Sequence, residues 1–101
     1  MDSLLESKII NELKTVFDPE IPVNVYDLGL IYNLSEKNGI LDVEMTLTAP
    51  GCPVADQIIE EIKMKLETIR GIRQVNITLV FEPVWNQDMM SEEAKLDLGF
   101  L

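Results

Sequence analysis

NGILDVEMTLT, the stretch from residue 38 to residue 48, decides the fold of this chain. Its apolar residues occupy every second position, which is typical of a strand with one buried face and one polar face. Asn38-Gly39 suits the positive φ angles of a tight hairpin turn, so another strand is expected before it. We therefore predict antiparallel strands at Leu28–Ser35 and Ile40–Thr48, in a sheet that is covered on one side only.

Helices flank this hairpin in the sequence. Apolar residues at helical spacing predict a helix from about Leu4 to Phe17, which Ser3 begins as part of a capping box and Asp18-Pro19 ends. A second apolar stripe predicts a helix that opens at Pro53 and ends at Arg70-Gly71.

The remaining elements complete one domain over residues 1–101. Alternation predicts a third strand at 75–81, and Ser91 offers an N-cap for a short helix from Glu92 to Leu98. The strand-helix-strand unit is expected to cross over right-handed. The predicted class is α+β: a two-layer α/β sandwich of order α-β-β-α-β-α, with a three-stranded mixed sheet and helices packed on one face. The pattern leaves the central strand open.

The charge of the chain limits its partners. It has 18 acidic and 8 basic residues, which give a net charge of -10. Such a surface repels phosphate backbones and anionic lipid headgroups, so neither nucleic-acid nor membrane binding is expected. The first residues carry no signal-peptide pattern, and no stretch approaches the ~18 apolar residues of a membrane span. We expect a cytoplasmic protein.

The supply of reactive side chains argues against an enzyme. The chain has one cysteine and no histidine, so it has no internal disulfide and lacks the commonest protein ligand of zinc, copper and non-haem iron. Catalytic triads and cysteine-histidine dyads are excluded for the same reason. A metal held within one chain would need Cys52 and carboxylates.

Cys52 is the main candidate for chemistry. Pro53 suits the first position of a helix, which puts Cys52 at the N-cap. The positive end of a helix lowers the pKa of a thiol, and the thiolate is the form that binds metals. The alternative is that Cys52 is a small buried residue with no reactivity.

Several residues are candidates for a supporting role or for contact with a partner. The carboxylates are Asp18, Glu20 and Asp27, although Asp18 has an alternative role as a helix cap and Asp27 as the start of a turn. Thr46 and Thr48 are expected on the polar strand face leading to Cys52, a face on which threonine needs no special purpose. Trp85 is expected either to cover the core or to form an edge for a partner.

Three stretches follow one another along the chain: DPEIP at 18–22, YDLGLIY at 26–32 and MTLTAPGCP at 45–53. FEPVW at 81–85 and the ending MSEEAK at 90–95, followed by Leu98-Gly99, extend the pattern. Together they resemble the SufT/PaaD-like family of iron-sulfur cluster assembly domains over nearly the whole chain.

The resemblance implies an accessory role in building or delivering iron-sulfur clusters, with Cys52 as the reactive position. Asp27 and Thr46 or Thr48 match positions grouped near it in the family. PaaD-type relatives carry an additional cysteine-rich C-terminal segment, and this chain ends at Leu101 without one. General cluster assembly is therefore expected in preference to maturation of one oxygenase.

Ligand number implies a partner for any cluster. Clusters typically take four thiolates, and one chain supplies a single cysteine thiol. The expected cargo is a labile iron-sulfur cluster or iron, shared through Cys52 with a second chain or an external thiol. The partners expected from the resemblance are the assembly machinery and client apo-proteins, and a homodimer is one way to supply the second thiol.

Two other functions remain as alternatives. The first is a metal-free adaptor that docks client proteins to the cluster machinery through its open sheet face, the Trp85 edge and its acidic surface. The second is a thiol-dependent enzyme, which is the weaker alternative because no internal general base accompanies the cysteine.

Overall fold

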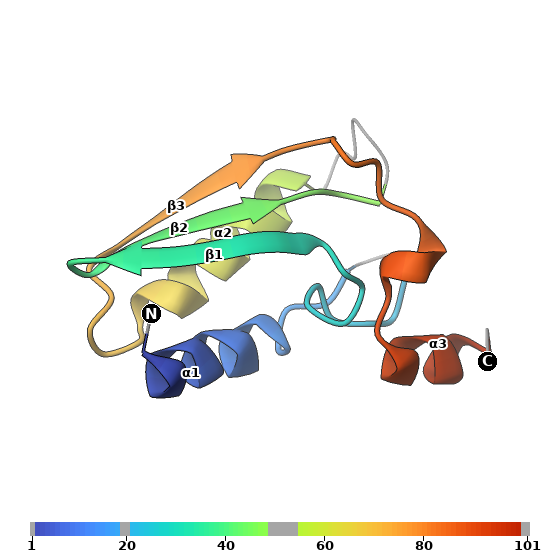
Figure 1. Ribbon diagram of the computed structural model, residues 1–101, viewed down its shortest axis with the longest axis horizontal. Coiled ribbons are helices and arrows are strands. Elements are labelled where there is room, and N and C mark those ends of the chain that lie inside the picture. The colour runs from blue at the N-terminus through green and yellow to red at the C-terminus, as the bar shows by residue number, and fades with distance from the viewer. Residues whose placement is uncertain (1, 19–20, 49–54, 100–101) are drawn as a thin grey trace.

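The sheet has three strands, and the middle one is β2. The computed structural model describes residues 2–18, 21–48 and 55–99. The strands are β1 (Ile31–Lys37), β2 (Ile40–Met45) and β3 (Gln74–Leu79). β2 pairs antiparallel with β1 and parallel with β3, so the predicted mixed sheet is confirmed and its central strand is identified (Figure 1).

The hairpin between β1 and β2 forms as the sequence predicts. Asn38 and Gly39 have φ values of 54° and 84°, which is the left-handed pair that matches the twist of a two-residue hairpin. Leu34 faces Val43 across the two strands. The predicted strands were too long at the ends away from the hairpin, because β1 begins at Ile31 and β2 ends at Met45, whereas β1 continues past the predicted end at Ser35 to Lys37.

The first helix is α1 (Ser3–Leu13), and it is shorter than predicted. Its N-cap is Asp2, whose Oδ1 accepts a hydrogen bond from the Leu4 amide at 3.0 Å, so the capping role expected of Ser3 was wrong. A carboxylate stabilises this end of a helix better than a hydroxyl because it also interacts with the helix dipole.

Residues 14–17 do not continue the helix, because the backbone of residues 16 and 17 pairs with that of residues 24 and 25. The Val25 amide donates to the Val16 carbonyl at 2.8 Å, and Phe17 forms an isolated antiparallel bridge with Asn24. The side chain of Val16 is fully buried in this arrangement. A tertiary contact thus ends the helix four residues before the predicted end at Phe17.

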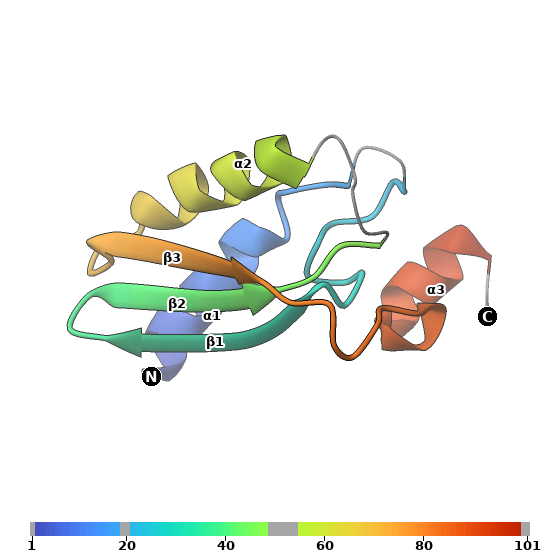
Figure 2. The same ribbon diagram turned by 90° about the horizontal axis from the view of Figure 1, so that it is seen from above.

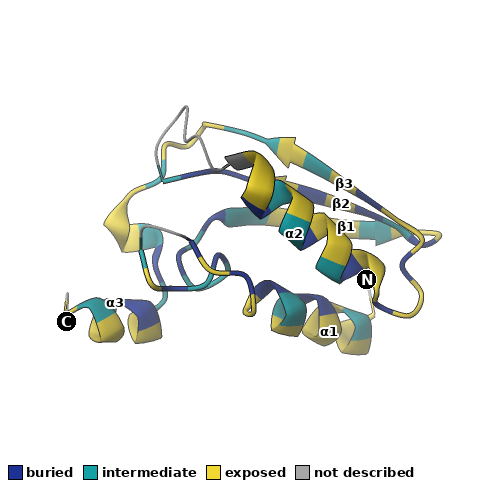
Figure 3. Ribbon diagram, turned by 180° about the vertical axis from the view of Figure 1, so that it is seen from behind, coloured by how far each residue is buried: buried dark blue, intermediate teal, exposed yellow. Residues whose placement is uncertain are grey.

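The second helix, α2 (Ala55–Glu67), crosses from β2 to β3 and packs with α1 on the buried face of the sheet (Figures 1 and 3). Ile58, Ile62 and Leu66 point into the core, as the apolar stripe predicts. They meet alternating residues of β2, of which Leu41 and Met45 have no exposed surface. These contacts belong to one continuous apolar core.

The C-terminal part runs beside the end of the sheet (Figure 2). The 3₁₀-helix η1 (Gln87–Met89) was not predicted, whereas α3 (Glu92–Leu98) has the predicted bounds. Ser91 caps α3, with its Oγ accepting from the Ala94 amide at 3.2 Å. Within the described ranges, no helix combines the length and the apolar character needed to cross a bilayer.

Candidate functional site

The predicted site residues that the structure describes lie at one end of the sheet. Here β2 and β3 end, α2 begins, and the segments 14–18, 21–30 and 80–91 lie alongside (Figures 1 and 2). We call this the carboxyl end of the sheet. Cys52, Pro53 and Glu20 lie outside the described residues, so their expected roles stay predictions.

Thr46 and Thr48 follow directly on β2 at this end. Thr46 is 1% exposed, so its expected place on the polar strand face was wrong. The reason is that the strand ends at Met45, and the next amide, that of Thr46, donates to the Leu30 carbonyl at 2.8 Å. Thr48 is half-buried.

Asp18 organises the turn that follows it. Its side chain is 7% exposed, and its Oδ1 accepts from the Ile21 amide at 3.0 Å. Because α1 already ends at Leu13, Asp18 does not cap that helix, and this alternative was wrong. The carboxylate is a hydrogen-bond acceptor within the loop.

Asp27 belongs to a single helical turn that is capped at both ends. At its start, Asn24 Oδ1 accepts from the Asp27 amide at 2.9 Å while Asn24 Nδ2 donates to Asp27 Oδ2 at 2.7 Å. At its end, Gly29 has φ of 81°, and the Gly29 and Leu30 amides donate to Tyr26 and Val25 carbonyls, which is a Schellman motif. This turn occupies the residues that were expected to begin the first strand.

The segment 80–91 is tied to this turn at several points. Trp85 is half-buried, and its Nε1 donates to the Leu28 carbonyl at 2.6 Å. The Ser91 amide donates to the Asp27 carbonyl at 2.8 Å. A Cβ at Gly29 would collide with the carbonyl oxygen of Met89, so η1 lies directly against the turn. Trp85 packs against the core, and its predicted contact with a partner stays a prediction.

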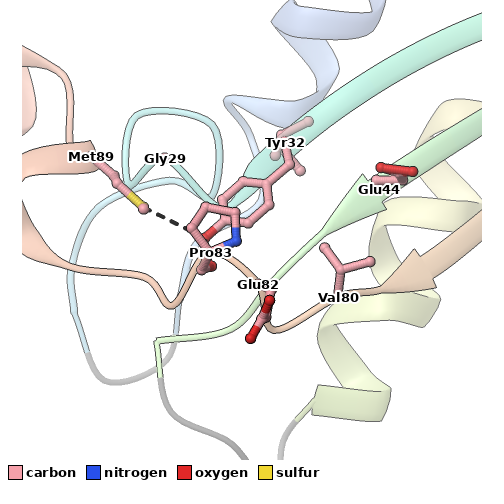
Figure 4. A pocket seen from close by; sticks show the side chains of 8 residues that line it. Gly29, Tyr32, Glu44, Val80, Glu82, Pro83 and Met89 are labelled. Carbon is pink, nitrogen blue, oxygen red and sulfur yellow. Dashed lines mark hydrogen bonds between the residues drawn. The ribbon is translucent and has the colours of Figure 1, made fainter.

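A shallow pocket opens beside this segment (Figure 4). Its volume is about 610 Å³, and its lining comes from the turn, the sheet and the segment 80–91. The lining residues are Gly29, Ile31, Tyr32, Glu44, Val80, Glu82, Pro83 and Met89.

Sequence reasoning assigned no role to Tyr32, Glu44 or Glu82, and it considered Met89 only as part of the apolar group around Trp85 that covers the core or forms an edge for a partner. Tyr32 and Glu82 fall within stretches that carry the family resemblance, and that was the only signal for them. The polar position of Glu44 on its strand was predicted, but its place in the same pocket as Tyr32 depends on the strand register, which shifts between Ile31 and Asn33.

The described part of the chain contains no group of three or more Cys, Asp or Glu side chains placed to hold a metal ion. Asp18 and Asp27 instead accept hydrogen bonds inside their own loop. The structure therefore brings Asp18, Asp27, Thr46 and Thr48 to one end of the sheet without joining them in a common ligand set.

These features define a class of protein: a small α+β domain whose candidate site lies at the end of the sheet where β2 ends and α2 begins. A family model described as "Iron-sulfur cluster assembly protein" matches residues 6–79. The chain belongs to this family, which confirms the resemblance read from its sequence motifs.

Individual relatives extend the match over almost the whole chain. The chain is 62% identical over 97 residues to the Fe-S protein maturation auxiliary factor of Porphyromonas gingivalis, covering 95% of this chain and 92% of that protein. It is 41% identical over 85 residues to the Fe-S protein maturation auxiliary factor SufT of Staphylococcus aureus, covering 83% and 97%. The crystal structure of a domain of unknown function, DUF59, from Bacillus anthracis superposes with a TM-score of 0.88 at 34% identity, covering 97% and 94%.

Proposed function

We propose that this protein is an auxiliary factor in the maturation of iron-sulfur proteins and that it handles iron or a cluster transiently through Cys52. The observation that carries the proposal is the 62% identity to a protein named for this role, over 95% of the chain. Cys52 is the one cysteine of the sequence and lies within MTLTAPGCP, one of the stretches that carry the family resemblance.

Chain connectivity supports a position for Cys52 near the carboxyl end of the sheet. Four residue steps separate it from Thr48, and an extended chain spans at most ~3.6 Å per residue, so its Cα is within about 14 Å of that of Thr48. Asp18, whose Oδ1 accepts from the Ile21 amide, and the turn 24–30 lie at this same end. A cluster carried on Cys52 would thus lie close to these loops.

Ligand exchange is the chemistry that one thiolate supports. Since a cluster typically takes four thiolates, a second chain, a client protein or a small thiol supplies the remaining ligands. In transfer, a thiolate of the recipient replaces that of Cys52, and no electron needs to move. A single protein ligand favours release to a recipient that offers several cysteines.

Anaerobic reconstitution tests the proposal. The protein is incubated with ferrous iron and sulfide in the presence of glutathione, and visible absorption and native mass are then measured for the wild type, Cys52→Ser and Cys52→Ala. We expect a cluster absorption and bound iron in the wild type, and the loss of both in the two variants. Asp42→Asn serves as a control for iron held by the acidic surface, and it should behave as the wild type does.

A maturation assay separates this function from the adaptor alternative. Activation of an apo-protein that needs a four-iron cluster is measured with the wild type and with Cys52→Ala. The thiol proposal requires the variant to be inactive. Full activity of a folded Cys52→Ala protein would exclude the thiol and leave a metal-free adaptor.

A further inference from the structure

The pocket beside segment 80–91 has two carboxylates and no cation in its lining. Glu44 and Glu82 both have exposed side chains. Across the described ranges, neither makes an ion pair or a hydrogen bond, and the single ion pair found there joins Lys65 to Glu61 on α2. The two charges are therefore available to a ligand.

A carboxylate without a partner is not a general property of the open sheet face, because Asp42 on the same strand and face has one. Asp42 Oδ1 accepts from Asn76 Nδ2 at 3.2 Å, and Asn76 Oδ1 accepts from Gln74 Nε2 at 3.0 Å. Asp42 is thus engaged by a neighbouring side chain of the sheet. Glu44, two positions further along β2, has Asn33 and Thr78 as its register partners, yet it accepts no hydrogen bond within the described residues, and it lines the pocket (Figure 4).

The wall opposite Glu44 is held in position before any ligand arrives. Tyr32 Oη donates to the Pro83 carbonyl at 2.7 Å and lies 3.5 Å from Met89 Sδ (Figure 4). Because the hydroxyl proton is already used, the tyrosine offers a ligand mainly its ring. Proline has no amide N–H, and the Gly29 amide is engaged with the Tyr26 carbonyl.

The chemistry of the lining selects the kind of group that fits. The pocket combines aromatic, thioether and aliphatic surface with carboxylate acceptors. A ligand can therefore donate hydrogen bonds to the carboxylates and make apolar contacts with the walls. A guanidinium group has five N–H donors and no acceptor, is planar, stacks on aromatic rings and is more weakly hydrated than an ammonium. Arginine fits this lining better than lysine does.

We propose that this pocket binds an arginine side chain from an extended basic segment of a partner protein. Charge complementarity supports this occupant, since the chain carries a net charge of -10 and would steer a basic segment toward its surface. The inference goes beyond the proposed function because it assigns a partner surface made of residues other than Cys52.

Titration with small probes tests the proposal on the intact protein. The probes are acetyl-arginine amide, acetyl-lysine amide and acetyl-citrulline amide, of which the last keeps the shape of arginine and lacks its charge. Chemical shifts of the ¹⁵N-labelled protein report where each probe binds. We expect arginine to shift residues of the pocket, with lysine weaker and citrulline without effect.

Charge-removing variants provide the matched control. The double variant Glu44→Gln and Glu82→Gln should weaken arginine binding about tenfold or more, because both charged acceptors are lost. Asp42→Asn removes a carboxylate from the same strand and face outside the pocket, and it should change the affinity by less than about twofold, because Asp42 is engaged by Asn76 and does not line the pocket. All of these side chains are exposed, so the fold should persist.

Three results would overturn the proposal. They are shifts spread evenly over the acidic surface, equal binding of arginine and lysine, and an unchanged affinity in the double variant. Cys52→Ala should bind arginine as the wild type does, so this test and the cluster test can fail separately.

Discussion

Replacing Gly29 by alanine tests whether η1 and the turn 24–30 are packed as one unit. Gly29 has φ of 81°, and a Cβ there would strike the backbone carbonyl of Met89. A backbone atom cannot rotate away as the end of a side chain can. Either η1 moves away from the turn, or Gly29 gives up the conformation that ends it.

The expected cost has two parts. A non-glycine residue in the left-handed region loses roughly 1–2 kcal/mol, and an added methyl group in a packed site loses about 1–3 kcal/mol more. The sum is ~2–5 kcal/mol, which is a large share of the ~5–15 kcal/mol that stabilises a typical domain. With a urea m-value of ~1–3 kcal/mol/M, the unfolding midpoint should fall by about 1 M or more.

Urea unfolding followed by circular dichroism and by the fluorescence of Trp85 measures this effect. Gly71→Ala is the matched control, because Gly71 also has a positive φ, of 101°, and no atom lies within 4 Å of where its Cβ would stand. The control should show only the backbone part, ~1–2 kcal/mol. If Gly29→Ala proved no more destabilising than Gly71→Ala, the contact between the turn and η1 would be refuted.

Two further substitutions examine the same region. Asn24→Ala removes both hydrogen bonds to Asp27 and should destabilise the protein by ~1–2 kcal/mol in urea unfolding. The control Asn11→Ala, at an exposed position of α1, should change stability by less than ~0.5 kcal/mol. Equal effects of the two substitutions would refute the capping role of Asn24. Trp85→Phe keeps a ring against the core and loses the hydrogen bond to the Leu28 carbonyl. Thermal unfolding followed by circular dichroism should give a midpoint about 4–8 °C lower for each ~1 kcal/mol lost. An unchanged midpoint would mean that this hydrogen bond contributes nothing to stability.

The sequence pattern predicts an element correctly where the residues that form the pattern also make the contacts expected of that element in the folded protein. The alternation in β2 and the Asn38-Gly39 turn gave the hairpin, and the apolar stripe of α2 gave its buried face. α1 was predicted too long, since its last apolar residues serve a different contact. Val16 continues the helical spacing, but it is buried through pairing with residues 23–25.

The turn 24–30 was missed although its local signals are present. Asn24 and Asp27 stand three residues apart as a capping pair, and Gly29 follows as the C-terminal glycine. Residues 18–27 were interpreted as an ordered loop, because they include two prolines and show no clean periodicity, and the first strand was expected to begin at Leu28. The pocket could not be predicted, because Tyr32, Glu44 and Met89 come together only through the sheet register and the path of segment 80–91.

The pocket and the position proposed for Cys52 have a joint consequence for transfer. The pocket includes Glu44 near the end of β2, and we propose that Cys52, four residues after Thr48 in the sequence, lies near this same carboxyl end of the sheet. A partner anchored there by one arginine would present its cysteines to Cys52 at an effective concentration of the order of millimolar, given a short linker. Ligand exchange would then be effectively intramolecular. Weak anchoring suffices for this, and it also lets the partner leave once it has received the cluster.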